Sequence, residues 1–182
     1  MRPSDFRFCP HCASPLLLCG HDIPRSLCPS CGYTQYKNPT VGVAVVVVKK
    51  SAILLVRRRG SYDGLWCIPC GHAEWNEDVR ESARREMSEE TGLEVEVGPV
   101  FEVHSNFHER ERQTVGIWFV GRVVGGELKA GSDAREAEYF ALEALPKELA
   151  FPTDLLVIER LGQVLRGEEE AEARRLGAYL GG

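Results

Sequence analysis

The chain has 182 residues, of which 43% are hydrophobic, and its formal net charge is −5. This length predicts one ordinary domain with a small appendage, and the apolar content is sufficient for a core. The acidic balance excludes a general electrostatic attraction to nucleic acid or to a membrane surface. The first ten residues are polar and unlike a signal peptide, and the longest apolar run, 41–48, is too short to span a bilayer. We therefore expect a cytoplasmic protein.

Four of the seven cysteines form two C-x-x-C pairs near the start of the chain. Pairs at this separation predict a tetrahedral zinc site, with two disulfides or free thiols as the alternative that fits a cytoplasmic protein poorly. His11 and His21 lie nearby, but a closed site holds four ligands, so both are expected to be bystanders. Residues 1–37 are thus predicted to be a zinc ribbon that metal binding keeps folded. The expected zinc ligands are Cys9, Cys12, Cys28 and Cys31.

The rest of the chain contains strand-like and helix-like segments in turn. Valine-rich and alternating segments predict strands at 41–48, 52–58, 65–69, 94–104, 113–124 and 138–142. Helices are expected at 78–91, 153–166 and 168–180, with a helical turn within 142–149. The apolar side of the second helix is expected to carry Leu155, Leu156, Ile158 and Leu161. Strands on both sides of one long helix favour a mixed sheet between helical layers, an α/β architecture.

Segment 71–93, GHAEWNEDVRESARREMSEETGL, is the richest in carboxylates. On a helix over 78–91, Glu86, Glu89 and Glu90 project from one face, because positions three and four apart are neighbours. Their repulsion would destabilise the helix unless a cation lies among them, and Mg²⁺ prefers oxygen ligands of this kind together with substrate phosphates. The alternative is an exposed helix with Glu–Arg pairs four residues apart.

The spacing within this segment also matches a named pattern. Its defined positions are Gly71, Glu77, Arg85, Glu86, Met87, Glu89, Glu90, Gly92 and Leu93. On this match the chain resembles the Nudix hydrolase family over about residues 40–165. The attached ribbon is similar to that of a subset that includes NADH pyrophosphatases and enzymes acting on ADP-ribose or FAD-like molecules. The resemblance implies a Nudix-type α/β/α sandwich over residues 38–182, with the C-terminal helices included.

The resemblance further implies metal-dependent hydrolysis of the diphosphate in a nucleoside diphosphate linked to another group, here ADP-ribose, FAD or NAD(H). Mg²⁺ or Mn²⁺ would be held by Glu86, Glu89 and Glu90, with Glu90 in a bridging role. In the family, the carbonyl before the box glycine is often a ligand too. That residue is Cys70 here, where Gly or Ala is common. Because a carbonyl ligand does not depend on its side chain, the role is retained.

A further acid outside the box commonly completes the site in this family, as metal ligand or general base. Asp133 and Glu136 lie before the late short strand and are the candidates, with Glu109 and Glu111 as rivals. A general base needs reach as well as charge, and the sequence provides no distances. Each of these acids is equally well interpreted as a solvated loop carboxylate.

Substrate contacts are expected from residues on either side of the box. Arg57 and Arg58 suit phosphate, although alternation along a strand can turn one of them to solvent. Tyr62 and Phe107 are candidates for stacking on a base, with loop or core packing as the alternative. The downstream signature of NADH pyrophosphatases is replaced here by 104–108, HSNFH, so the substrate stays open among the named diphosphates.

Three further expectations concern pairs of residues and binding partners. Glu77 and Arg85 match family positions that shape the loop and helix through a salt bridge. Cys67 and Cys70 form another C-x-x-C pair, but it ends a strand instead of opening a helix, which favours packing over a redox role. The expected partner is a small nucleoside diphosphate derivative, with no nucleic acid and no membrane, and with a possible homodimer.

The alternative function is a non-catalytic nucleotide-sensing or RNA-binding module that uses the ribbon. Residues 1–40 carry four basic residues against two acidic ones, an excess of 4 − 2 = +2. This excess is weak for a phosphate-binding surface. The intact acidic group in 71–93 favours catalysis instead.

Overall fold

The structure is a computed structural model that describes residues 6–20, 24–109, 112–131 and 133–180. Two residues considered above, His21 and Glu111, lie outside the described residues. The chain divides into two compact units, Met1–Pro39 and Thr40–Gly182. Among the described residues, no helix is long and apolar enough to cross a membrane.

The N-terminal unit is built on a three-stranded antiparallel sheet of β1 (Leu17–Cys19), β2 (Arg25–Leu27) and β3 (Thr34–Gln35). Each C-x-x-C pair forms a tight turn of the same kind. The Ala13 N–H donates to the Cys9 carbonyl at 2.9 Å, and the Gly32 N–H to the Cys28 carbonyl at 3.0 Å. Ala13 and Gly32 both have positive φ, so the two turns match in backbone conformation.

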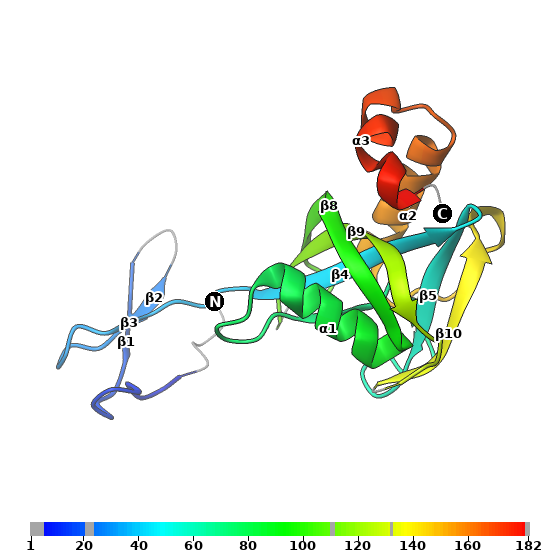
Figure 1. The fold of residues 1–182 in the computed structure, drawn as a ribbon. Helices are drawn as coiled ribbons and strands as arrows, with labels where there is room; N and C mark the ends of the chain where they lie inside the picture. Colours follow the sequence, from blue (N-terminus) through cyan, green and yellow to red (C-terminus); the bar gives the residue numbers. More distant parts are fainter. Residues whose placement is uncertain (1–5, 21–23, 110–111, 132, 181–182) are drawn as a thin grey trace. The chain divides into compact units, whose positions relative to one another are not determined.

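The C-terminal unit contains a seven-stranded sheet with the order β10-β5-β4-β9-β8, with β6 on β5 and β7 on β4 (Figure 1). Its strands are β4 (Thr40–Lys49), β5 (Ala52–Arg58), β6 (Trp66–Cys67), β7 (Cys70–His72), β8 (Leu93–Asn106), β9 (Thr114–Gly126) and β10 (Ala134–Ala141). Strands β4 and β9 are parallel and the other pairs are antiparallel. The predicted mixed sheet is therefore confirmed.

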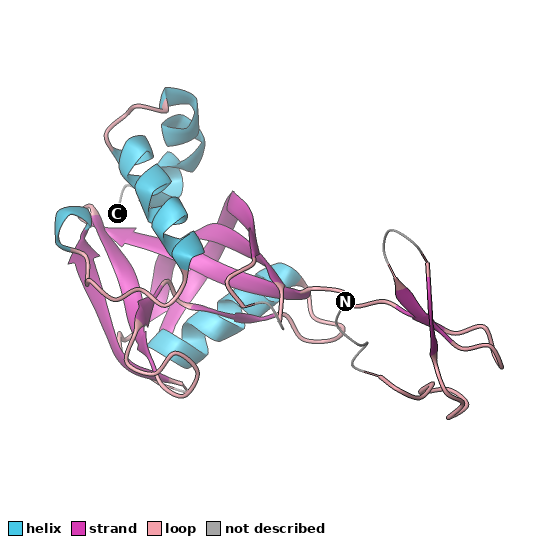
Figure 2. Cartoon of the chain, turned by 180° about the vertical axis from the view of Figure 1, so that it is seen from behind, coloured by secondary structure: helices cyan, strands magenta, loops and turns pink. Residues whose placement is uncertain are grey.

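Helices cover both faces of this sheet (Figures 1 and 2). They are α1 (Val79–Thr91), α2 (Pro152–Leu165) and α3 (Glu170–Leu180), with a short 3₁₀ turn, η1 (Leu142–Ala144), after β10. Helix α1 packs on one face through Ala83 and Met87, and α2 and α3 pack on the other through side chains that include Leu161 and Leu176. The result is the expected α/β/α arrangement.

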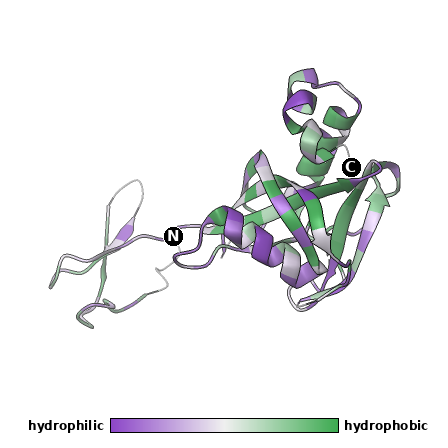
Figure 3. Ribbon diagram, viewed as in Figure 1, coloured by the Kyte–Doolittle hydropathy of each residue, from purple (hydrophilic) through white to green (hydrophobic). Residues whose placement is uncertain are grey.

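The valine run of β4 is explained by burial on both faces. Alternate side chains point to opposite faces of a strand. Val43, Val45 and Val47 accordingly join the cluster beneath α1, and the residues between them join the cluster beneath α2 and α3. Figure 3 shows hydrophobic residues concentrated on β4 and β5, and hydrophilic ones along α1.

Of the strand expected at 65–69, only the short β6 forms within that range, and a second short strand, β7, begins just after it on a different partner. The two residues between them cannot continue a ladder. The Ile68 N–H donates to an Asp154 carboxylate oxygen at 3.0 Å, and Pro69 has no N–H to donate. The Pro69 carbonyl accepts from the Val45 N–H at 3.1 Å, which leads the chain across to β4.

The apolar side predicted for α2 is wrong for Leu155 and Leu156, which are 54% and 51% exposed. Ile158 and Leu161 are buried as expected. Leu155 and Leu156 precede Leu161 by six and five positions, which places them about 120° and 140° away around a helix. The buried stripe is Thr153, Asp154, Val157, Ile158, Leu161, Gly162 and Val164.

Candidate active site

Helix α1 is bounded by a residue suited to each end. The Asp78 carboxylate caps the start, accepting from the Arg80 N–H at 2.9 Å. Gly92 ends the helix with φ of 68°, and its N–H donates to the Ser88 carbonyl. A Cβ at Gly92 would lie 2.6 Å from the Glu127 carbonyl oxygen. Glycine is therefore required here both for conformation and for space.

The three acids of α1 have different surroundings. Glu90 is 2% exposed, and its carboxylate accepts from the Cys70 N–H at 2.9 Å. The side chains of Glu86 and Glu89 are 15% and 48% exposed, and both pair with Arg85 Nη1, at 2.7 and 3.3 Å. Among the described residues, these carboxylates do not belong to any group of three or more possible metal ligands whose ligand atoms all lie within 4.8 Å of one another. The three acids share a region of the site, but they are not drawn tightly together.

The glycine that opens the box lies directly against Glu86. A Cβ at Gly71 would lie 2.0 Å from the Glu86 carboxyl carbon. Only glycine therefore allows β7 and the Glu86 carboxylate to approach each other so closely. Arg85 Nη2 also donates to the His72 carbonyl at 3.1 Å, which joins β7 to α1 a second time.

The expected salt bridge between Glu77 and Arg85 is confirmed. Arg85 Nε and Nη2 donate to the two carboxylate oxygens of Glu77, each at 2.9 Å. The Ser82 hydroxyl donates to the same carboxylate at 2.6 Å. Arg85, and then Ser82, lower the pKa of Glu77 to about 2. This two-point pairing fixes the loop before α1 against the helix.

Burial raises the pKa of Glu90 to about 8, and the nearby Asp133 and Glu86 act in the same direction. The Cys70 N–H and Arg58 oppose this rise. Burial also raises the pKa of Glu86, against the effect of Arg85. Buried negative charge of this kind is costly without a positive partner. Carboxylate oxygens are the ligands that Mg²⁺ and Mn²⁺ prefer, so the residues present fit a divalent cation.

A cavity of about 630 Å³ opens beside these acids. Strands β4 and β9 contribute to its lining. The loops after β5 and β8 and the turn before β10 contribute further residues. Of the residues predicted for the site, those that line it are Arg58, Tyr62, Cys70, Glu86 and Asp133. The rival acid Glu109 also lines it, and Glu90 lies behind this wall.

Glu89, which pairs with Arg85, is not among the described residues that line the cavity. Three other predicted residues also lie elsewhere in the part of the chain that the structure describes. Arg57 Nη1 pairs with Glu136 at 2.8 Å, and both side chains are about half exposed, at 42% and 51%. Phe107 is 66% exposed. None of these three is among the described residues that line the cavity. Arg57 and Arg58 are neighbours on one strand, so their side chains point to opposite sides, and only that of Arg58 lines the cavity.

Several residues that line the cavity were not predicted from the sequence, because they belong to no recognisable motif. They are Asn106, His108, Arg112, Trp118, Phe151 and Asp154. Asp154 is 2% exposed and accepts from the Ile68 N–H at 3.0 Å and from Trp118 Nε1 at 3.2 Å. Burial raises its pKa to about 7. The one available signal for Asp154 was an acid in the first turn of an amphipathic helix.

The second C-x-x-C pair lies beside the cavity. Cys67 and Cys70 are free thiols, and Arg58 Nη1 donates to both sulfurs, at 3.6 and 3.8 Å. The neighbouring Cys67 thiol and then burial raise the pKa of Cys70. A thiol whose pKa is raised is a weak nucleophile, so this environment favours the packing interpretation over the redox one.

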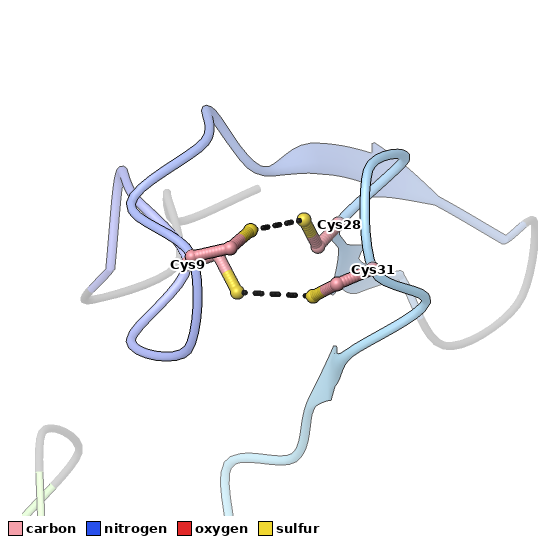
Figure 4. A group of neighbouring side chains, drawn as sticks. Cys9, Cys28 and Cys31 are labelled. Carbon is pink, nitrogen blue, oxygen red and sulfur yellow. Dashed lines mark hydrogen bonds between the residues drawn. The ribbon is translucent and has the colours of Figure 1, made fainter.

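The four cysteines of the N-terminal unit converge on one point (Figure 4). Their sulfur atoms all lie within 4.8 Å of one another. The Cys9–Cys31 and Cys12–Cys28 sulfur distances are 3.6 and 3.5 Å. A zinc tetrahedron with bonds of about 2.3 Å has edges of about 3.8 Å, whereas a disulfide bond measures about 2.0 Å. The cluster therefore fits zinc, and the sulfurs are not within disulfide distance.

His11 lies outside this cluster, as expected. Its ring packs against Tyr33 with centroids 4.6 Å apart. Its backbone N–H donates to the Cys9 sulfur at 3.4 Å. Hydrogen bonds of this kind stabilise the thiolates that bind a metal.

Comparisons with known proteins agree with the site. The NUDIX domain model matches residues 37–161. ADP-ribose pyrophosphatase of Methanocaldococcus jannaschii is 40% identical over 127 residues, covering 69% of this chain and 75% of the relative. The chain belongs to the Nudix hydrolase family.

Two further relatives extend the similarity toward the N-terminal unit. NAD-capped RNA hydrolase NudC of Chromobacterium violaceum is 28% identical over 157 residues, which are 85% of this chain and 56% of the relative. This chain thus spans little more than half the length of that relative. The crystal structure of a NUDIX hydrolase from Nitrosomonas europaea matches with a TM-score of 0.76 and 26% identity, covering 91% of this chain and 93% of that one.

Proposed function

We propose that this protein hydrolyses the diphosphate of a nucleoside diphosphate linked to another group, with ADP-ribose, FAD or NAD(H) as substrates. The observation that carries the proposal is the acidic wall of the cavity. Glu86 and Asp133 line it, and the buried Glu90 stands behind it. Glu90 has no ion-pair partner among the described residues. The 40% identity to an ADP-ribose pyrophosphatase supports the substrate class.

The residues of α1 and β7 have separate roles in this proposal. Glu86, Glu89, Glu90 and the Cys70 carbonyl would hold Mg²⁺ or Mn²⁺. When bound, these ions neutralise the charge of the diphosphate and activate water for attack. Arg58, which lines the same cavity, offers a guanidinium to phosphate oxygens.

Asp133 is the general base that we favour. It lines the cavity, and its charge acts on both Glu86 and Glu90. The loop that carries it is joined to α1, since the Gly131 N–H donates to the Glu90 carbonyl at 3.1 Å. Glu136 pairs with Arg57 and is not among the described residues that line the cavity, so Asp133 is the better placed of the two. Glu109 lines the cavity and stays as the rival.

The test is a panel of ADP-ribose, NADH, FAD and NAD-capped RNA, each with Mg²⁺ or Mn²⁺ and with products identified by chromatography. Glu86→Gln and Glu90→Gln should lower kcat by at least about a hundredfold, because losing an ion ligand removes several kcal/mol of transition-state stabilisation. Glu81→Gln is the matched control, since Glu81 lies on the same helix with a side chain 64% exposed. Glu90→Gln should not lower the unfolding temperature, because the glutamine oxygen can still accept from the Cys70 N–H and the side chain brings no charge into the buried position.

Equal turnover by the wild type and Glu90→Gln would contradict the proposed metal site. The competing function is a non-catalytic nucleotide-sensing or RNA-binding module. It would be favoured by salt-dependent binding of RNA together with no turnover of any substrate in the panel.

A further inference from the structure

The turn before β10 holds Asp133 between two other elements of the fold. On one side, the Gly131 N–H donates to the Glu90 carbonyl of α1 at 3.1 Å. On the other side, the Asp133 carbonyl accepts from the Arg59 N–H at 2.6 Å. Arg59 opens the loop of residues 59–65 that follows β5, which we call the β5 loop. The main chain around Asp133 is therefore bonded both to α1 and to the β5 loop.

Arg135 is the extra residue of a β-bulge just after Asp133. The register of β10 on β5 shifts between Ala134 and Glu136, which leaves Arg135 without a facing residue on β5. A bulge interrupts the alternation of a strand and redirects a side chain, and bulges are frequent beside active sites. The redirected Arg135 side chain reaches Asp63 in the β5 loop.

The ion pair between Asp63 and Arg135 uses both carboxylate oxygens. Arg135 Nη2 lies 2.6 Å from Oδ1 and 2.7 Å from Oδ2, and Nε donates to Oδ1 at 3.0 Å. Arg135 holds the pKa of Asp63 below its usual range, so both partners are charged at neutral pH. A guanidinium that donates through two nitrogens fixes the orientation of the two groups. We call this ion pair the Asp63–Arg135 clamp.

The β5 loop is itself held by the strand that precedes it. The Gly64 N–H donates to the Arg58 carbonyl at 2.9 Å, and Arg57 Nε donates to the Gly64 carbonyl at 2.8 Å. Arg58 Nε donates to the Ser61 carbonyl at 3.0 Å. The clamp therefore ties β10 to a loop with several bonds of its own.

The location of the clamp argues against a mainly stabilising role. The side chains of Asp63 and Arg135 are 49% and 48% exposed, and exposed ion pairs add little to folding stability. Neither residue is among the described residues that line the cavity, whereas Asp133 lines it. The feature that the clamp can control is thus the placement of Asp133.

We propose that Asp63 and Arg135 are positioning residues that hold Asp133 in place as the general base. The inference rests on the proposed function, because it explains how the base assigned there is kept within reach. A base must lie within hydrogen-bond distance of the proton that it takes. A displacement of about 1 Å can lower a rate about a hundredfold.

The first experiment measures kcat and KM for ADP-ribose with Mg²⁺. Arg135→Ala and Asp63→Ala should each lower kcat about tenfold, the lower end of the usual effect of residues that orient a group in a site. KM should stay within about twofold, because neither side chain lines the cavity. The double variant should have the kcat of the slower single variant, because both residues act through one contact.

The decisive comparison is made in Asp133→Asn, which lacks the base. In that background Arg135→Ala should lower kcat no further, because the clamp acts only through Asp133. A residue that merely supports the fold would lower kcat equally in both backgrounds. Such an equal fall, or no fall in either background, would overturn the clamp.

Mn²⁺ binding followed by calorimetry is a second measurement that needs no turnover. The charge of Asp133 acts on Glu86 and Glu90, so its placement should affect a cation bound near them. Arg135→Ala should weaken Mn²⁺ binding more in the presence of Asp133 than in Asp133→Asn. Removal of the Arg135 charge acts alike in both backgrounds and cancels in this comparison. Equal changes in the two backgrounds would contradict the clamp.

Arg166→Ala is the matched control for loss of an exposed ion pair. Arg166 Nε lies 2.7 Å from a carboxylate oxygen of Glu168, and their side chains are 62% and 52% exposed. This variant should have the kcat, the KM and the Mn²⁺ affinity of the wild type.

Failure of the proposed function is recognised separately, as no product from any substrate of the panel with the wild type. The clamp is then judged by Mn²⁺ binding alone. An active wild type with an unchanged kcat in Asp133→Asn would instead overturn the clamp and leave the proposed function in place.

Discussion

At the residue scale, the box positions of this chain divide into residues that hold the site together and residues that face it. Gly71, Glu77 and Arg85 hold β7, the following loop and α1 in register through close contact and paired hydrogen bonds. Glu86 faces the cavity and Glu90 is buried behind it. Substitutions at the two kinds of position should therefore differ, one acting on stability and the other on turnover.

The Glu77–Arg85 pair predicts a dependence of stability on pH. Arg85 and Ser82 lower the pKa of Glu77 from 4.5 to about 2 in the folded protein. A carboxyl group with a lowered folded pKa contributes stability that is complete above the unfolded pKa and is lost as pH falls through the folded value. The contribution of Glu77 should therefore disappear between pH 4.5 and about 2.

Urea unfolding of the wild type and Glu77→Gln across this window measures the effect. The stability difference between the two proteins should be full above pH 4.5 and should shrink as pH approaches 2. Glu81→Gln, at an exposed position of α1, should follow the wild type throughout. A difference between wild type and Glu77→Gln that stayed constant with pH would contradict the assignment.

At the element scale, helices and strands were predictable where their pattern was strong. The segment 78–91, which lacks Pro and Gly, predicted α1 to within one residue. Its bounds were predictable because the capping residues, Asp78 and Gly92, directly adjoin the helix in the sequence. The apolar side of α2 was not predictable from composition alone, since Leu155 and Leu156 are as hydrophobic as the buried Leu161. Which leucine is buried depends on how the helix rotates against the sheet.

This correction on α2 predicts a contrast between two leucines. Leu161→Ala should lower the free energy of unfolding by about 2–5 kcal/mol, because Leu161 is fully buried beneath the sheet. Leu155→Ala, on the same helix, should change it by less than about 0.5 kcal/mol. Denaturant unfolding measures both. Comparable losses for the two variants would show that the helix is rotated from the position described here.

At the scale of the whole molecule, the chain forms two compact units with different sources of stability. The C-terminal unit has buried clusters on both faces of its sheet. The N-terminal unit has three short strands, and its strands β1 and β3 include no buried residue. Among its described residues, few are buried besides Cys9, Ser26 and Cys28. We therefore expect this unit to depend for folding on a metal bound at its four-cysteine cluster.

Zinc removal should therefore act on one unit and spare the other. Elemental analysis should find one zinc per chain, held by the single four-cysteine cluster of the described residues. Cys28→Ser should lose it, and Cys19→Ser, outside the cluster, should retain it. Hydrogen exchange after chelation should show loss of protection in β1–β3 and unchanged protection in β4 and β9. Loss of protection in both units would contradict their independence.

The sequence by itself determined what depends on local spacing. Spacing within short segments predicted the two C-x-x-C pairs, the bounds of α1, the Glu77–Arg85 pair and the family. Helix caps, metal-binding turns and helix faces each involve residues only a few positions apart in the chain. Only the tertiary structure decided which distant residues share the cavity. It turned Arg58 inward and Arg57 toward Glu136, and it brought Tyr62, His108 and Phe151 together. Such contacts depend on how strands and loops far apart in sequence pack, and no local pattern encodes that packing.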